Sequence, residues 1–235
     1  MERRIALTGP ASERAAKRWM DAVYTVPNWV PLHFPLVRIV GQRIRGSRVG
    51  ATPSMVAVTS QNALPALKAL WDERPELRDV PHGAVGVATA RAMRSLGVDP
   101  VAVCSADRSD AAELAERVNA LTEPGQTVLW PRGDRATELR QRLTEAGRIV
   151  VDPVAYRSED IEGSIVPKRL YAVFFASPSA VRVWLKTPDA ARVTAVAIGE
   201  TTYAELTPAY ASFARMTLLS KPTPRALAEA LASLG

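Results

Sequence analysis

The feature that most constrains the fold is an internal repeat: strand-like segments in the first half of this 235-residue chain return in the second half. The matched pairs are residues 56–64 (VAVTSQNAL) with 173–181 (VFFASPSAV), 85–89 with 198–202, and 128–132 with 5–9, at shifts of 117, 113 and 123 residues. Three pairs with such similar shifts are hard to obtain by chance. The repeat therefore predicts two similar lobes.

Each repeated segment is a short apolar run that ends in Gly, Ser, Thr or Pro and precedes a helical pattern. Parallel strands deliver the chain into helix N-termini in this way. We therefore expect α/β lobes with parallel sheets, and polar strand ends that face a shared cleft. The predicted strands are 4–7, 55–59, 84–87, 101–104, 127–130, 171–175, 194–198 and 216–219, and the predicted helices are 15–23, 63–71, 89–96, 110–121, 135–146, 179–185, 201–206 and 224–234.

Composition excludes several kinds of site. Cys104 is the one cysteine, so a disulfide framework or a thiolate metal site is excluded. The two histidines, His33 and His82, are too few for a His-rich zinc site and lie outside the repeated segments. The sequence has no dinucleotide-binding glycine motif, no phosphate-binding loop and no G-x-S-x-G nucleophile turn.

The charge of the chain points to an anionic partner. The formal net charge is +6, and the sequence pI is about 9.8. The basic residues are scattered along predicted helices, so they either solvate outer faces or attract an acidic small molecule. Aromatic residues make up only 6%, which argues against nucleic acid. No apolar run approaches the ~20 residues of a membrane span, and the N-terminal run breaks at Thr8-Gly9-Pro10, so we expect a cytoplasmic protein.

Hydroxyl side chains recur at the predicted strand-to-helix turns: Ser60, Thr89, Ser177, Ser179, Thr201 and Thr202. One interpretation is helix capping, which favours Ser and Thr everywhere. The other is carboxylate binding, because helix N-termini offer unpaired N–H groups and a Ser or Thr adds a donor.

Two extended runs contain prolines, 30–40 and 149–156, which argues for exposed or edge strands. Tyr156 ends the second of these runs, and it is either an interfacial aromatic or a proton-donating phenol.

An ordered set of loose segments runs through nearly the whole chain: VTS at 58–60 with NA at 62–63, VGVATA at 85–90, LWPRG at 129–133, PVAYRS at 153–158 after Gly147, FASPSAV at 175–181, AIGETT at 197–202, and PTP at 222–224 before Leu227. In this ordered set the sequence resembles the uroporphyrinogen-III synthase family. The family usually opens with strand-Thr-Arg-Pro, whereas Gly9 stands here in place of the arginine. A substrate contact from the first strand end is therefore in doubt.

The resemblance implies two flavodoxin-like parallel-sheet lobes and a role in porphyrin and heme biosynthesis. Residues 1–36 and 159–235 would form one discontinuous lobe and residues 43–152 the other, with 37–42 and 153–158 as linker strands. The implied protein is a monomer without metal or cofactor. Its substrate would be hydroxymethylbilane, a linear tetrapyrrole with eight carboxylates, which the family converts to uroporphyrinogen III by loss of water, inversion of ring D and ring closure.

Within this interpretation Tyr156 is the expected catalytic residue, assisting departure of the hydroxyl. The expected substrate-binding residues are Ser60, Gln61, Thr89, Arg132, Gly133, Ser177, Pro178, Ser179, Thr201 and Thr202. Two alternatives remain. One is a binding or regulatory module on the same duplicated fold that has lost activity, which the absent arginine favours. The other is a two-lobe solute-binding protein, which needs an export signal.

Overall fold

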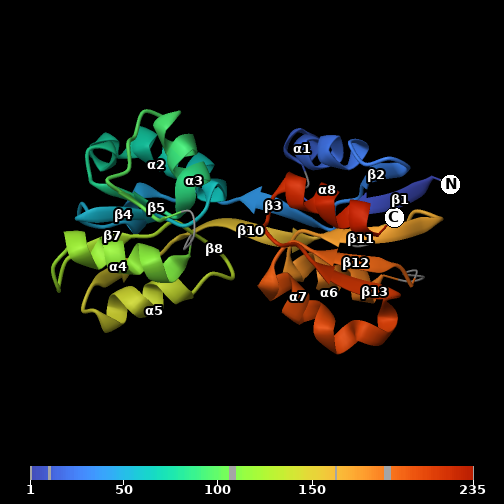
Figure 1. Ribbon diagram of the computed structural model, residues 1–235. Helices are drawn as coiled ribbons and strands as arrows, with labels where there is room; N and C mark the ends of the chain where they lie inside the picture. The colour runs from blue at the N-terminus through green and yellow to red at the C-terminus, as the bar shows by residue number, and fades with distance from the viewer. Residues whose placement is uncertain (1, 10–11, 106–109, 162, 188–191, 235) are drawn as a thin grey trace. The chain divides into compact units, whose positions relative to one another are not determined.

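The computed structural model describes residues 2–9, 12–105, 110–161, 163–187 and 192–234 (Figure 1). The chain forms two compact units. Unit 1 comprises Met1–Arg38 and Glu159–Gly235, and unit 2 comprises Ile39–Ser158. No helix of the described residues is long and apolar enough to cross a membrane.

Unit 1 contains a five-stranded sheet in the order β13-β12-β11-β1-β2, with every pair parallel. Its strands are β1 (Arg3–Leu7), β2 (Trp29–His33), β11 (Leu170–Phe175), β12 (Thr194–Ala197) and β13 (Arg215–Leu218). Counted along the chain from the β2 edge, the order is 2-1-3-4-5, which is the flavodoxin order. Pro31 lies in β2, the edge strand, where a missing backbone donor is tolerated.

Unit 2 contains a second parallel sheet, in the order β6-β5-β4-β7-β9. Its strands are β4 (Met55–Val58), β5 (His82–Ala84), β6 (Ala102–Val103), β7 (Thr127–Leu129) and β9 (Ile149–Val151). This is the arrangement of unit 1 with the chain circularly permuted: β4 is central like β11, and β5 and β7 take the places of β12 and β1. These are the segments paired by the sequence repeat, so the predicted duplicated α/β fold is confirmed.

Helices cover both faces of each sheet (Figure 1). In unit 1, α1 (Glu13–Tyr24) and α8 (Pro224–Ser233) pack on one face, and α6 (Pro178–Lys186), α7 (Glu200–Leu206) and the 3-10 helix η4 (Thr207–Ser212) on the other. In unit 2, α2 (Leu64–Glu73) and α3 (Gly86–Arg94) oppose α4 (Ala111–Leu121) and α5 (Glu138–Glu145). Short 3-10 helices η1 (Gly46–Arg48), η2 (Gln61–Ala63) and η3 (Pro75–Arg78) complete unit 2.

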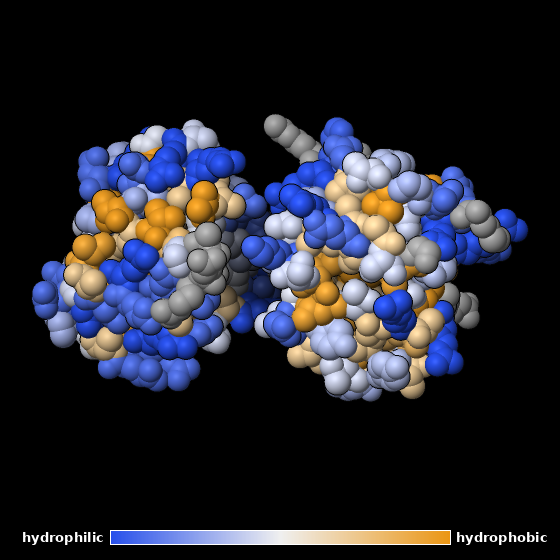
Figure 2. Space-filling view, in the orientation of Figure 1, coloured by the Kyte–Doolittle hydropathy of each residue, from blue (hydrophilic) through white to orange (hydrophobic). Residues whose placement is uncertain are grey.

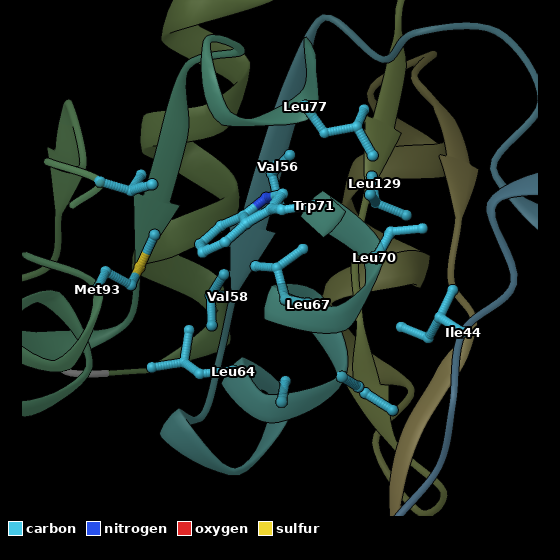
Figure 3. Close-up of a cluster of buried hydrophobic side chains, with 14 of the residues drawn as sticks. Ile44, Val56, Val58, Leu64, Leu67, Leu70, Trp71, Leu77, Met93 and Leu129 are labelled. Carbon is cyan, nitrogen blue, oxygen red and sulfur yellow. The ribbon is translucent and has the colours of Figure 1, made fainter. Parts of the chain in front are cut away.

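The cores are apolar and contain large aromatic rings. Trp71 lies inside the α2–α3 side of unit 2, among Leu67, Leu70 and Val56 (Figure 3). In unit 1 the rings of Trp19 and Phe174 lie 4.8 Å apart. The visible face of each unit carries both hydrophilic and apolar residues (Figure 2), which is ordinary for folded domains.

Three further strands form a small sheet in the order β3-β10-β8. They are β3 (Val37–Gly41), β10 (Val154–Asp160) and β8 (Arg132–Gly133). β10 and β8 are parallel, and Tyr156 lies opposite Gly133 in their register. The pairing of β10 with β8 thus joins residues 153–158 to residues 129–133, two of the segments that carry the family resemblance.

Several predicted element boundaries are displaced by a few residues, and the turn from β5 into α3 has a clear cause. The sequence predicts a strand over 84–87 and a helix from Thr89, but β5 ends at Ala84 and α3 begins at Gly86. Gly86 has φ +74°, a conformation that glycine adopts without strain, so the chain turns from strand to helix within two residues. Thr89 is consequently the fourth residue of the helix rather than its first.

Candidate functional site

In unit 2, polar groups gather beyond the carboxyl end of the central strand β4. Thr59 Oγ1 accepts a hydrogen bond of 3.0 Å from Trp130 Nε1. Ser60 Oγ accepts one of 3.2 Å from the Asn62 amide and so caps η2. α3 and β8 both contact η2. Ligands of open α/β sheets bind at such strand ends.

Tyr156 is positioned on this edge by its contact with Gly133. A Cβ on residue 133 would lie 2.8 Å from Cζ and 2.9 Å from Cε2 and Oη of the tyrosine. The Asp134 amide donates 3.1 Å to the Tyr156 carbonyl, and Asp134 Oδ1 accepts 3.2 Å from the Ser158 amide. The Tyr156 hydroxyl makes no hydrogen bond to any other described residue. Its ring is held, and its hydroxyl remains able to bind a ligand.

Gln61 lines an open cavity of about 590 Å³ in unit 2, together with Asn62, Leu64 and residues of α3. Thr89 is 5% exposed and lies in α3, which contacts the same 3-10 helix. The 3-10 helix η2, which carries Gln61 and is capped by Ser60, thus contacts both α3, which carries Thr89, and β8. On β8, Gly133 lies against Tyr156. Asp134 and Thr59 were not predicted. Their adjacency to Gly133 and Ser60 in sequence is the signal that could have found them.

Arg132 is already paired within unit 2. Its Nε donates 2.9 Å to Asp152 Oδ2, and its Nη1 donates 3.0 Å to the carbonyls of Gly133 and Asp134. Asp152 also accepts 2.7 Å from Arg140 Nη1. The guanidinium therefore orders the loop after β8 in this structure, and its role toward a substrate stays a prediction.

In unit 1 the corresponding predicted residues follow the neighbouring strands β11 and β12. Ser177 Oγ accepts 3.3 Å from the Ala180 amide and caps α6, with Pro178 as the first helical residue. Arg182 Nη2 donates 3.2 Å to Ser179 Oγ. Helix capping thus explains the hydroxyl side chain of Ser177, as it explains that of Ser60.

Capping does not account for Thr89 or Thr202. The N-cap positions of α3 and α7 are Val85 and Gly199, neither of which supplies a side-chain cap. Thr202 is 1% exposed, whereas Thr201 is exposed. The hydroxyls of Thr89 and Thr202 make no hydrogen bond to any described residue. Neither hydroxyl is among the fully buried, unpaired polar atoms of the described residues, so each retains some access to solvent or to a ligand.

Gly9 fits tightly at the end of β1. It is buried, and a Cβ there would lie 3.0 Å from Ala176 Cβ. The preceding Thr8 donates 2.9 Å from Oγ1 to the Phe174 carbonyl, which holds the end of β1 against β11. An arginine at position 9 would require one of these backbones to shift, so the departure from the family pattern has a packing basis.

The strongest pKa perturbation lies away from these strand ends. Burial lowers the pKa of His82 to about 4, and a hydrogen bond between Nδ1 and the Val80 carbonyl opposes this only in part. Its Nε2 is buried without a described partner. Within the described ranges, no group of three or more His, Cys, Asp or Glu side chains could hold a metal ion.

Comparison with known proteins identifies the fold and the family. The sequence profile for uroporphyrinogen-III synthase HemD matches residues 28–229. The fold is similar to uroporphyrinogen-III synthetase from Helicobacter pylori (TM-score 0.69, 18% identity, 99% of this chain and 100% of that one). It is also similar to a mutant uroporphyrinogen III synthase from Thermus thermophilus (TM-score 0.65, 17% identity, 99% and 98%).

A search of curated protein sequences finds no match. At these identities the solved structures establish the fold alone, and the profile match over most of the chain establishes the family. This chain belongs to the uroporphyrinogen-III synthase family.

Proposed function

We propose that the protein acts as a hydro-lyase that converts hydroxymethylbilane to uroporphyrinogen III, with loss of water and inversion of ring D. The family match over residues 28–229 is the observation that carries this proposal. The placement of Tyr156 beside Gly133, with its hydroxyl unbonded to described residues, supports it from the geometry.

The substrate-binding groups in this proposal are hydroxyls and backbone amides. Thr89 and Thr202 offer hydroxyls that no described residue uses, one in each unit. Ser177, Pro178 and Ser179 begin α6, where a helix N-terminus favours a carboxylate. Many such contacts can hold a flexible polycarboxylate in a curled conformation, so most of the rate enhancement comes from positioning.

Tyr156 has the acid–base role. Its phenol donates a hydrogen bond, and then a proton, to the terminal hydroxyl of the bilane as the carbon–oxygen bond breaks and water leaves. The electron-deficient carbon is attacked by ring D to give the spiro intermediate. Rearrangement and closure release a proton from the pyrrole carbon, which restores the phenol. The step needs no cofactor.

The test is incubation of the purified protein with hydroxymethylbilane, scored for uroporphyrinogen III against the uninverted isomer I. Accumulation of isomer III above the protein-free control is the expected result. Tight binding of the bilane with isomer I as the sole product would instead indicate the non-catalytic module. Nothing in the comparisons favours that alternative.

The oligomeric state and location belong to the same proposal. The protein is proposed to work as a cytoplasmic monomer without nucleic-acid or membrane partners, as the sequence predicts. Light scattering coupled to size-exclusion chromatography should give a mass near 25.4 kDa. Cell fractionation should recover the activity in the cytoplasmic fraction.

A further inference from the structure

Unit 2 contains a second polar cavity, of about 560 Å³, that the predicted site residues do not line. Four of its lining side chains are arginines, namely Arg43, Arg45, Arg48 and Arg157. The rest of the described lining consists of Gln42, Ile44, Pro153 and Val154, with no carboxylate. The first three arginines lie on the segment after β3, and the fourth lies on β10.

The segment that carries these arginines is anchored to the core. Ile44 is 2% exposed and points into the apolar cluster around Leu70 and Leu129 (Figure 3). With Ile44 directed inward, the flanking Arg43 and Arg45 are exposed at the cavity. The arginines are thus presented by a fixed backbone.

Glu73, at the end of α2, fixes the same segment from outside. Its Oε2 accepts 2.9 Å from the Gly46 amide, and its Oε1 accepts 3.2 Å from Arg43 Nε. These bonds hold the pKa of Glu73 below its usual range, with the Gly46 amide as the largest cause. Arg74 Nη1 donates 3.1 Å to the Gly50 carbonyl and secures the far end of the segment.

The charges at this cavity are unbalanced. Arg43 shares the carboxylate of Glu73. Arg48 and Arg157 form no ion pair with any described residue, and Arg45 acts on Glu73 only through longer-range attraction. Like charges repel unless an anion joins them, and the planar guanidinium group matches a carboxylate in two-point geometry. The cavity is thus suited to a ligand with several carboxylates.

We propose that this arginine cavity binds two or more carboxylates of a single ligand. The carboxylates belong either to the tetrapyrrole substrate, in which case the inference rests on the proposed function, or to a separate small polycarboxylate. Arg157 directly follows Tyr156 on β10, and successive strand side chains point to opposite faces, so the arginine cavity is separate from the surroundings of the phenol. Arg132, the arginine that the sequence singled out, is occupied by Asp152.

The test compares Arg48→Gln/Arg157→Gln with the control Arg91→Gln/Arg142→Gln. Both double variants lose two exposed positive charges from unit 2, but the control residues lie on α3 and α5, outside the cavity. Citrate is the probe, and its binding is measured by calorimetry at constant ionic strength. We expect saturable binding to the unaltered protein, at least about tenfold weaker in the cavity variant and within about twofold in the control.

Turnover of hydroxymethylbilane by the same proteins identifies the source of the carboxylates. A KM raised about tenfold in the cavity variant alone, with citrate competing, assigns them to the substrate. Unchanged turnover with citrate binding lost assigns a separate ligand. No saturable citrate binding, equal weakening in both variants, or binding retained in the cavity variant overturns the proposal. Calorimetry measures citrate binding without turnover. A protein that binds citrate at the arginine cavity but forms no uroporphyrinogen III would therefore contradict the proposed function and leave the cavity proposal standing.

Discussion

The Tyr156 ring occupies the space that a side chain on Gly133 would fill: a Cβ there would lie 2.8 Å from Cζ of the ring. The two residues face each other across the parallel pairing of β10 and β8. The glycine therefore sets the position of the phenol.

Gly133→Ala should lower kcat by about tenfold or more, because the outer end of the tyrosine ring must rotate away from the new methyl group. Loss of stability should be small, since a ring end can move without shifting the backbone. Steady-state kinetics and thermal melting of Gly133→Ala, each measured against the unaltered protein, decide. Unchanged activity would show that the glycine does not position the phenol.

Tyr156→Phe should slow formation of uroporphyrinogen III without abolishing it, and the melting temperature should stay unchanged. The hydroxyl makes no hydrogen bond to described residues, and the ring that packs against the core is retained. The measurement is the initial rate of isomer III formation in parallel with circular dichroism melting. An unaltered rate would leave the phenol without an acid–base role.

Thr89→Val and Thr202→Val should each reduce kcat/KM roughly ten- to a hundredfold, if each hydroxyl donates a charge-assisted hydrogen bond to a substrate carboxylate. Valine keeps the shape of the side chain, and neither threonine caps its helix, so stability should change little.

Ser177→Ala provides the contrasting case. It removes the cap on α6 and should lower the free energy of unfolding by ~1 kcal/mol. Chemical denaturation and kinetics on the three variants separate the two roles. Threonine variants that keep activity within twofold would direct the search for substrate contacts to Ser60 and the backbone amides.

Stability should fall between pH 6.5 and pH 4 because of His82. Burial lowers its folded-state pKa to about 4, so the unfolded chain, with a histidine pKa near 6.5, binds more protons in that range. The contribution, on the order of 3 kcal/mol, is fully present above pH 6.5 and is lost as the pH falls toward 4.

Urea unfolding at pH 7.5 and pH 4.8 measures this loss. The window stays above the range in which Glu73 and Glu113, whose pKa values are lowered, become protonated. His82→Gln should flatten the pH dependence, whereas His33→Gln should retain it. If the free energy of unfolding of His82→Gln still falls between pH 7.5 and pH 4.8, groups other than His82 cause the pH dependence.

Much of the architecture could be predicted from the sequence. The repeat of residues 56–64 at 173–181 predicted β4 and β11 as equivalent strands, because short apolar runs that end in small polar residues are local patterns. The structure places both at the centre of their sheets. The same segments supported the family. Single elements were displaced by a few residues where conformation decided, as at Gly86, whose positive φ starts α3 early.

Which polar side chains are occupied and which are available depends on contacts that form in the folded chain. Asp152 lies 20 residues from Arg132, and the sequence contains no signal that they pair. Helix propensity could not distinguish Ser177, which caps α6, from Thr202, which does not cap α7. The two α/β units follow from local hydrophobic patterning, which the sequence displays directly. Strand register, which depends on the folded chain, placed Tyr156 opposite Gly133, and the anchoring of the segment after β3 by Ile44 and Glu73 brought its three arginines to one cavity with Arg157.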